Sequence, residues 1–330
     1  MSTDHPTPFA GLTPDAVLDA LESVGLICDG RQFALNSYEN RVYQVGIEDR
    51  APLIAKFYRP GRWSDAQILE EHAFVRELAD DEIPVVAPLE IGGKTLLTHQ
   101  DFRFALFPRR GGRAPELEDP AVLEWMGRFL GRIHAVGATQ AFDTRPVLDP
   151  ITFGHQPRDW LLAHGFIPAD LKEAWSSTVA HALDAVARCY DNAGATALLR
   201  LHGDCHSGNV LWTDEGPHFV DFDDARTGPA VQDLWMLLPG DPAAIPQAWK
   251  HLLAGYEQFR DFDDNELHLV EALRTLRLIH YSYWLARRWE DPAFPATFPW
   301  FNTPHYWQDR ILELREQLAL MQEAPLRPAH

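Results

Sequence analysis

The chain has 330 residues, of which 46% are hydrophobic and 11% aromatic, which is enough for two globular domains or one large one. Its 48 acidic against 29 basic side chains give a formal net charge of −19, which disfavours polyanions, so neither nucleic acid nor a membrane surface is an expected partner. Because no apolar run approaches the roughly 18 residues of a membrane span, no leader-like start is present and the three cysteines show no paired spacing, we expect a cytoplasmic protein.

The first third of the chain predicts a small lobe that is rich in β-strands. A helix over about 14–24 is expected to begin with the cap, proline and acid of Thr13-Pro14-Asp15. Alternating apolar residues then predict a three-stranded antiparallel start, with strands at about 33–35, 42–45 and 53–58. The stretch Ser64-Asp65-Ala66-Gln67 resembles a capping box and opens a second helix. Further strands are expected at about 85–89, 95–98 and 102–107.

Proline and glycine interrupt the hydrophobic pattern at about 108–114, which is the expected domain border. We therefore place an N-lobe at 1–108 and a C-lobe at 109–330. In the C-lobe the pattern predicts helices at about 120–136, 168–192, 246–260, 265–290 and 305–322, and only 209–212 and 218–222 are typical of strands. Aromatic residues in the last third favour packing between helices, with the wall of a substrate cleft as the alternative. The sequence thus predicts an α+β protein, in which a small sheet-rich lobe precedes a larger helical one.

The densest group of reactive side chains lies between 202 and 224. Asp204 and Asn209 stand on a loop that enters a predicted strand, and Asp221 ends the next strand. Pairing of the two strands brings all three side chains to one place. One carboxylate and the carboxamide can then face Mg²⁺, while the second carboxylate orients a hydroxyl, which is the arrangement that phosphoryl transfer needs. The order His202-Gly203-Asp204, Asn209 and Asp221-Phe222-Asp223 fits the spacing of the catalytic segment in kinases.

Other interpretations of this segment are weaker. An Asp with an Asn five residues later is often a simple turn pair, but here two apolar strands and a second acid accompany it. His202, Cys205 and His206 are too crowded for a closed zinc site, whose ligands come from two separated segments. We expect His202 to brace the loop and Cys205 to be a small buried packing residue.

Three residues of the N-lobe are candidates for a nucleotide site. Lys56 is a charged residue inside the apolar strand 53–57, as is the phosphate-binding lysine of kinases, although a solvated strand lysine is the simpler alternative. Its acidic partner should lie on the next helix, where Glu71 is preferred and Glu70 is the near alternative. Ser37 lies in the loop 36–41, which lacks the glycines of ordinary protein kinases but offers a hydroxyl and backbone amides for phosphate.

At these positions the sequence resembles the aminoglycoside and choline kinase-like branch of the protein kinase fold, and more closely the bacterial stress response kinase A family. The resemblance to the branch rests on the His-Gly-Asp loop at 202–204. The resemblance to the family rests on two stretches, Ser-Tyr-Glu-Asn-Arg at 37–41 and Gly-Pro-Ala-Val-Gln-Asp-Leu-Trp at 228–235. The matching stretches span most of the chain from about 12 to 290. This resemblance implies a two-lobed, protein kinase-like fold.

The resemblance also implies a role for each matching residue. Asp204 is expected to be the catalytic base, and Asp221 a catalytic residue that binds magnesium together with Asn209. Ser37 and Lys56 are expected to contact the phosphates of ATP, with Glu71 as the acidic partner of Lys56. Asp233 is expected to hold the catalytic loop through backbone hydrogen bonds. The family implies phosphorylation of protein serine or threonine, autophosphorylation and a part in bacterial stress survival.

Two other functions remain open on the residues alone. The same loop serves small-molecule kinases, so the alternative acceptor is the hydroxyl of an amino alcohol, a homoserine-like compound or an aminoglycoside. A nucleotide-binding scaffold without catalysis is less favoured, because the candidate base, metal ligands and lysine are all present. The stretch between Asp221 and Asp233 is too short for a long activation segment, so we expect basal activity. We also expect a monomer.

Overall fold

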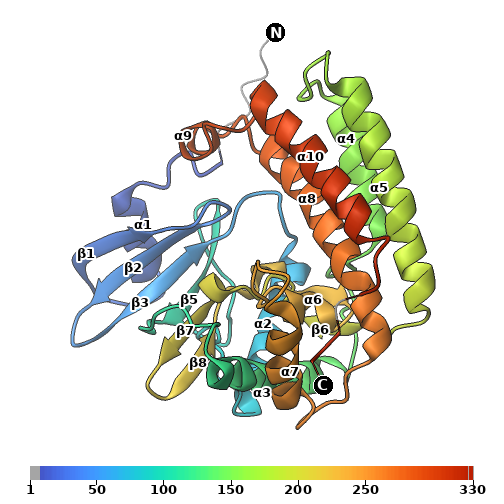
Figure 1. Ribbon diagram of the computed structural model, residues 1–330. Helices are drawn as coiled ribbons and strands as arrows, with labels where there is room; N and C mark the ends of the chain where they lie inside the picture. Colours follow the sequence, from blue (N-terminus) through green and yellow to red (C-terminus); the bar gives the residue numbers. More distant parts are fainter. Residues whose placement is uncertain (1–7, 326, 330) are drawn as a thin grey trace. The chain divides into compact units, whose positions relative to one another are not determined.

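The computed structural model describes residues 8–325 and 327–329 (Figure 1). Residue contacts divide the chain into two compact units. The first holds the chain up to Ala114 together with Asp143–Arg145 and Gly208–Asp223, and the second holds Pro115–Phe142, Pro146–Ser207 and the chain from Asp224 onward. Within the described residues, no helix combines the length and the apolar character needed to cross a membrane.

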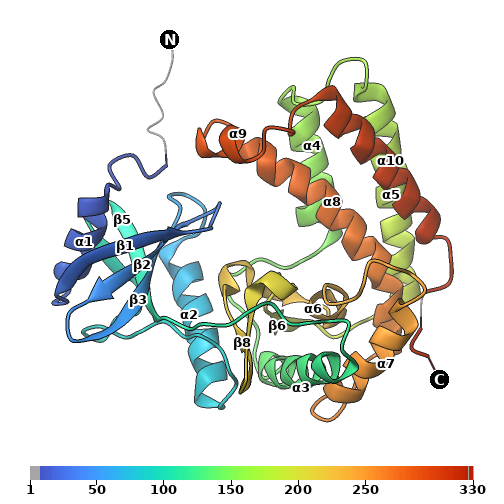
Figure 2. The same cartoon turned by 60° about the vertical axis from the view of Figure 1, so that its left-hand side comes forward.

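A five-stranded antiparallel sheet forms the centre of the first unit (Figures 1 and 2). Its strands are β1 (Cys28–Leu35), β2 (Arg41–Ile47), β3 (Arg50–Phe57), β4 (Leu97–His99) and β5 (Phe102–Pro108), in the spatial order β1-β2-β3-β5-β4. The predicted antiparallel start of three strands is confirmed. Lys56 pairs with Val42 on one side and with Ala105 on the other, so it stands in the middle of the sheet.

Two helices cover opposite faces of this sheet (Figure 2). Helix α1 (Pro14–Glu22) packs against Ala55 and Phe57, whereas α2 (Asp65–Asp80) packs against the face that carries Ala105. Both helices begin where the sequence predicts, α1 after the cap Thr13 and α2 with a capping box. Because side chains alternate along a strand, Lys56 points away from α1 and toward the α2 face.

Two expectations for the first unit are corrected. The segment 85–89 is not a strand. Val85 forms an isolated bridge with Phe219, the Val86 amide donates to the Phe219 carbonyl, and the Leu89 amide donates to the Leu106 carbonyl. Pro88 lies inside this segment and has no N–H for a ladder, which accounts for the difference. The strand expected at 95–98 is β4, which begins two residues later.

A two-stranded hairpin of β7 (Val210–Thr213) and β8 (Gly216–Phe219) belongs to the first unit and confirms the strand pair expected there. The second strand ends earlier than predicted, because Phe222 lies in a short 3-10 helix, Phe222–Asp224.

The second unit is mainly helical. Its helices are α3 (Pro120–Gly137), α4 (Gln156–Ala163), α5 (Lys172–Ala193), α6 (Val231–Trp235), α7 (Ile245–Tyr256), α8 (Val270–Arg287), α9 (Ala293–Thr297) and α10 (Pro304–Leu320). The five long predicted helices correspond to α3, α5, α7, α8 and α10, with a 3-10 turn, Asp264–Leu269, ahead of α8. The expectation of only two strands beyond the border is wrong, because β6 (Leu199–Leu201) pairs with β9 (Arg226–Gly228). These strands have three residues each, which is too short for a visible alternation.

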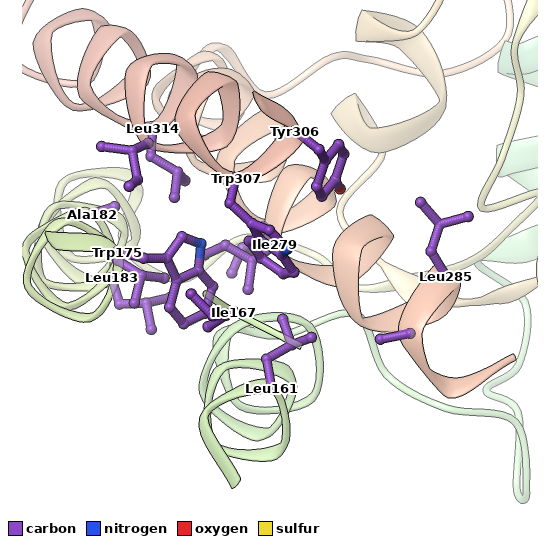
Figure 3. Close-up of a cluster of buried hydrophobic side chains, with 14 of the residues drawn as sticks. Leu161, Ile167, Trp175, Ala182, Leu183, Ile279, Leu285, Tyr306, Trp307 and Leu314 are labelled. Atoms are coloured by element: carbon purple, nitrogen blue, oxygen red, sulfur yellow. The ribbon is translucent and has the colours of Figure 1, made fainter. Parts of the chain in front are cut away.

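Helices α4, α5, α8 and α10 enclose the main core of the second unit (Figure 3). Trp175 of α5 and Trp307 of α10 meet edge to face, with ring centroids 5.9 Å apart and planes at 90°. Most aromatic residues of the last third lie in this core or pack against it, among them Tyr281, Trp284 and Tyr306. Packing between helices therefore accounts for them.

Candidate active site

Lys56 is the centre of a charged cluster in the first unit. Its Nζ donates to Oδ1 of Asp221 at 2.9 Å and lies 3.1 Å from Oδ1 of Asp223. Burial by itself lowers the pKa of Lys56, but the carboxylates of Asp221 and Asp223 outweigh it and raise that pKa well above its usual value. Lys56 is therefore a permanently charged ammonium group in the interior of the unit.

Asp221 and Asn209 are brought together by the β7–β8 hairpin. The Val220 amide donates to the carbonyl oxygen of Asn209 at 3.0 Å, so Asn209 stands opposite the residue that precedes Asp221. Asp221 has φ +60°, a left-handed conformation that turns the chain sharply after β8. Its side chain is 54% exposed, so the carboxylate is open to solvent even though it pairs with Lys56. Together the two residues present hard oxygen donors, which suit a magnesium ion.

Asp223 is more deeply buried than Asp221 and has three cationic neighbours. Lys56 and Arg62 approach its carboxylate, and Arg145 donates to its backbone carbonyl at 2.6 Å. Arg62 also lies 3.8 Å from Glu39. These contacts tie the end of the hairpin to the sheet and fix the backbone on which Asp221 stands.

Glu70 and Glu71, the two candidates for the acidic partner of Lys56, have different surroundings in the structure. Glu70 accepts hydrogen bonds from backbone amides of Asp143–Arg145, so its carboxylate is engaged by that segment. Glu71 is buried in the charged cluster, where Arg145 approaches its Oε2 at 3.4 Å. Burial raises the pKa of Glu71 to about 7, against the opposing effect of the Lys56 charge. Lys56 thus acts on Glu71 through its field, while its ion pairs within the described chain are with Asp221 and Asp223.

The loop 36–41 is fastened to the segment after β3. The Arg59 amide donates to Oδ1 of Asn40 at 3.0 Å, and the Arg59 side chain donates to the carbonyl of Glu39 and pairs with its carboxylate. Ser37 lies in this loop and is half-buried. In the part of the chain that the structure describes, its hydroxyl has no hydrogen-bond partner, so it is available to a ligand.

The loop 202–204 belongs to the second unit and is held from below by Asp233 of α6. The carboxylate of Asp233 accepts hydrogen bonds from the amides of His202 at 2.9 Å and Gly203 at 2.8 Å, which are the backbone hydrogen bonds expected of Asp233. Nε2 of His134 lies 3.1 Å from the same carboxylate. Gly203 has φ +84°, and a Cβ there would come within 2.2 Å of the Asp224 carbonyl. Only glycine fits this position.

Asp204 follows this rigid turn, and its side chain contacts two basic residues. Arg277 of α8 donates to Oδ1 at 2.7 Å, and Nε2 of His206 lies 3.5 Å from Oδ2. Burial alone raises the pKa of Asp204, but His206 and Arg277 outweigh it and lower that pKa below its usual value. Asp204 is thus a carboxylate that is ionised at neutral pH and held in one orientation.

Sequence reasoning selected the acids and the lysine of these clusters but missed three arginines, Arg62, Arg145 and Arg277. Each is far along the chain from the acid that it contacts. The only local signal is that Arg62 follows soon after Lys56. Of the predicted site residues, the first unit holds Lys56, Glu71, Asn209 and Asp221, and also Ser37 on its loop. Asp204 belongs to the second unit.

Comparison with known protein families gives a match over most of the chain. Residues 30–269 match the model of the phosphotransferase enzyme family. The chain is 46% identical over 323 residues to the serine/threonine protein kinase RdoA of Salmonella typhimurium, with 98% of each chain covered. It is 47% identical over 318 residues to stress response kinase A of Escherichia coli K12, with 96% of each chain covered.

A solved structure with a similar fold is that of an amicoumacin kinase in complex with AMP-PNP, Ca²⁺ and amicoumacin. The TM-score is 0.72, and 96% of this chain and 95% of that one are covered, at 19% sequence identity. At this identity the likeness concerns the fold alone, and it agrees with the α+β architecture described above.

Proposed function

The chain belongs to the phosphotransferase enzyme family, within the group of the stress response kinase A proteins, and on this premise we propose that it is an ATP- and Mg²⁺-dependent serine/threonine protein kinase of the bacterial stress response. Its fold is the kinase-like α+β fold that the sequence predicts. The observation that carries the proposal is the buried ammonium group of Lys56, which lies 2.9 Å from the exposed carboxylate of Asp221.

The first unit supplies the groups that bind ATP. Lys56 is charged, buried and fixed in the middle of the sheet, so it can meet a phosphate oxygen without a further loss of side-chain freedom. The Ser37 hydroxyl and the amides of its loop are a second phosphate contact. We assign Glu71 to the same cluster, where it balances part of the positive charge of Lys56 and Arg145.

Asn209, just before β7, and Asp221, just after β8, fit a divalent cation. Asn209 and Asp221 offer a carbonyl and a carboxylate oxygen, and both are hard donors of the kind that Mg²⁺ prefers over softer ligands. When bound, the metal supplies charge neutralisation on the phosphates. The role of the protein is to hold these two donors in place. The contacts of Asp223 with Arg62 and Arg145 restrain the end of the hairpin that carries Asp221.

In the second unit, Asp204 acts as the general base. It takes the proton of the acceptor hydroxyl as the hydroxyl oxygen forms a bond to the γ-phosphorus and the bond from that phosphorus to the bridging oxygen of ADP breaks. A carboxylate that stays ionised at neutral pH suits this role, since the pKa of Asp204 is lowered by His206 and Arg277.

The acceptor is proposed to be a serine or threonine hydroxyl, including one of this chain itself. The support is the name of the relative at 46% identity, a serine/threonine protein kinase. The segment between Asp221 and Asp233 is short, and within 222–234 all residues except Asp224 and Thr227 are buried. Such a segment does not need phosphorylation to become ordered, so we propose basal activity. We further propose that the enzyme is a monomer. ATP is a cytoplasmic metabolite, and we place the enzyme there.

The test is phosphoryl transfer by the purified chain with Mg²⁺ and labelled ATP, in wild type and in Asp204→Asn. We expect label on serine or threonine of the wild type, and a loss of about 100-fold or more in the variant. Label found only on small amino alcohols or aminoglycosides would assign the alternative, a small-molecule kinase. Equal rates in the two proteins would remove Asp204 from the mechanism.

A further inference from the structure

Arg277 of α8 forms an ion pair with Asp204, the proposed base. We propose that Arg277 is a positioning residue for phosphoryl transfer, which holds Oδ1 of Asp204 and so fixes the orientation of the carboxylate that takes the proton of the acceptor hydroxyl. This inference rests on the proposed function of Asp204 as base.

The backbone of the loop 202–204 is already fixed by other contacts. Asp233 holds the amides of His202 and Gly203, and the Asp204 amide donates to Nδ1 of His202 at 3.4 Å. Gly203 cannot shift toward the Asp224 carbonyl, because the two are in close contact. The freedom that remains at this position is rotation of the Asp204 side chain, and this is what a side-chain contact can remove.

Two basic side chains meet the two oxygens of Asp204 unequally. Arg277 donates to Oδ1 at 2.7 Å, a distance typical of a strong charge-assisted hydrogen bond. His206 lies 3.5 Å from Oδ2, which is a longer contact. Because both oxygens belong to one rigid planar group, a short bond to Oδ1 restricts the rotation of the whole carboxylate. The geometry therefore assigns the orientation of the Asp204 carboxylate to Arg277.

The stability of the protein gives little reason for this ion pair. The side chains of Arg277 and Asp204 are 45% and 23% exposed, and ion pairs at such exposure contribute about 0–1 kcal/mol to folding. The pair joins the middle of α8 to the loop before β7, and each of these is already anchored by its own core contacts. The effect of removing the guanidinium should thus be on the reaction rather than on the fold.

A cation at this place also meets an electrostatic need of the reaction. The base is an anion that has to work beside the anionic phosphates of ATP, and like charges at short range oppose one another. Arg277 offsets the charge of Asp204 without giving it a proton, because a guanidinium stays protonated. Loss of Arg277 should therefore both loosen the base and increase its repulsion from the phosphates.

The experiment measures ATP turnover and autophosphorylation with Mg²⁺ in the full chain carrying Arg277→Met, with Arg277→Lys as the conservative variant. We expect Arg277→Met to lower kcat about tenfold or more, because small misplacements of a reacting group are costly, with KM for ATP within about twofold of wild type. Arg277→Lys should recover part of the loss, since an ammonium keeps the charge and one donor. The melting temperature of both variants should stay within a few degrees of wild type.

Arg274→Met is the matched control, because Arg274 lies one turn earlier on α8 and pairs with Glu271 instead, at 3.0 Å. A kcat of Arg277→Met within about twofold of wild type, a loss that Arg274→Met reproduces, or a change confined to KM for ATP overturns the inference. Asp204→Asn distinguishes a failure of this inference from a failure of the proposed role of Asp204 as base. If Asp204→Asn is inactive while Arg277→Met is normal, only this inference fails, and if Asp204→Asn is active, the proposed base fails and the inference with it.

Discussion

The ammonium group of Lys56 lies 2.9 Å from the carboxylate of Asp221, and this ion pair joins strand β3 to the segment that follows β8. The pair is buried at one end and open at the other, since the Lys56 side chain is 8% exposed and that of Asp221 54%. Asp223 holds Lys56 from a second direction. The lysine is thus fixed by the protein, while an oxygen of Asp221 remains accessible from solvent.

Replacing Lys56 by Met should lower kcat/KM for ATP about 100-fold or more, because a preorganised charge that meets the phosphates is lost. Met keeps the length of the stem, so the effect on packing is small, and Arg62 still accompanies Asp223. The measurement is the initial rate of phosphorylation over a series of ATP concentrations.

Lys94→Met is the control for the loss of one positive charge, because Lys94 lies on an exposed turn of the same unit. It should leave kcat/KM for ATP within about twofold of wild type, as surface substitutions usually have small effects. If both variants lose activity equally, Lys56 has no special part in binding ATP.

Replacing Gly203 by Ala should destabilise the protein and reduce kcat together. A left-handed residue with a Cβ costs about 1–2 kcal/mol, and overpacking against the Asp224 carbonyl should add about 1–3 kcal/mol. Because the backbone has to shift, Asp204 moves with it. Urea unfolding and phosphorylation rates measure the two effects.

Gly165→Ala separates conformation from crowding. Gly165 has φ +71° with nothing within 4 Å of an added Cβ, so this variant should lose only about 1–2 kcal/mol and keep its activity. Equal losses of stability in the two variants would mean that the close approach at Gly203 has no cost.

How much of this molecule is predictable from its sequence depends on whether the signal is local. Helices α1 and α2 were predictable from their caps, Thr13 and the Ser64 capping box, which act within one turn of the chain. The site acids were predictable because Asp204, Asn209 and Asp221 are close in sequence. The strand predicted at 85–89 was wrong, because its apolar residues indicate a strand while Pro88 prevents the ladder of backbone hydrogen bonds.

Long-range partners could not be predicted in this way. Arg62, Arg145 and Arg277 look like ordinary surface arginines in the sequence, and only tertiary structure selects the acid that each contacts. Glu70 and Glu71 are adjacent on α2, yet one caps the backbone of Asp143–Arg145 and the other is buried beside Arg145. The grouping of Gly208–Asp223 with the first unit is likewise invisible in a linear pattern, and the lobes at 1–108 and 109–330 stay a prediction.

Replacing Asp233 by Asn should lower both stability and kcat. Asp233 and His134 are fully buried, and the Asp233 carboxylate accepts from three N–H groups, those of the His202 and Gly203 amides and of the His134 ring. An amide must turn its NH₂ group toward one of these donors, which leaves buried donors unpaired and should cost about 3 kcal/mol. Urea unfolding gives the stability, and phosphorylation at a temperature where both proteins are folded gives the rate.

Asp261→Asn is the control for this change of charge, because Asp261 is exposed in the same unit. It should leave both quantities near their wild-type values. If Asp233→Asn behaves in the same way, the hydrogen bonds of Asp233 do not set the position of the loop.

Replacing Glu266 by Gln should make stability less dependent on pH. Glu266 accepts a hydrogen bond from the Val231 amide at the start of α6, the helix that carries Asp233, and burial raises the pKa of Glu266 from 4.5 to about 7. The folded state thus favours the protonated acid. Its stabilising effect is complete below about pH 4.5 and is lost as the pH rises to about 7, by at most roughly 3 kcal/mol.

Urea unfolding at pH 5 and pH 8 tests this directly. Compared with wild type, Glu266→Gln should gain relative stability at the higher pH, because glutamine can accept from Val231 and has no proton to lose. Asp263 and Arg260 also act on Glu266, with opposite signs, so they change the size of the effect but not its direction, which burial sets. Glu257→Gln, at an exposed position after α7, is the control and should follow wild type at both pH values. A difference between wild type and Glu266→Gln that is the same at pH 5 and pH 8 would show that Glu266 does not titrate in this range.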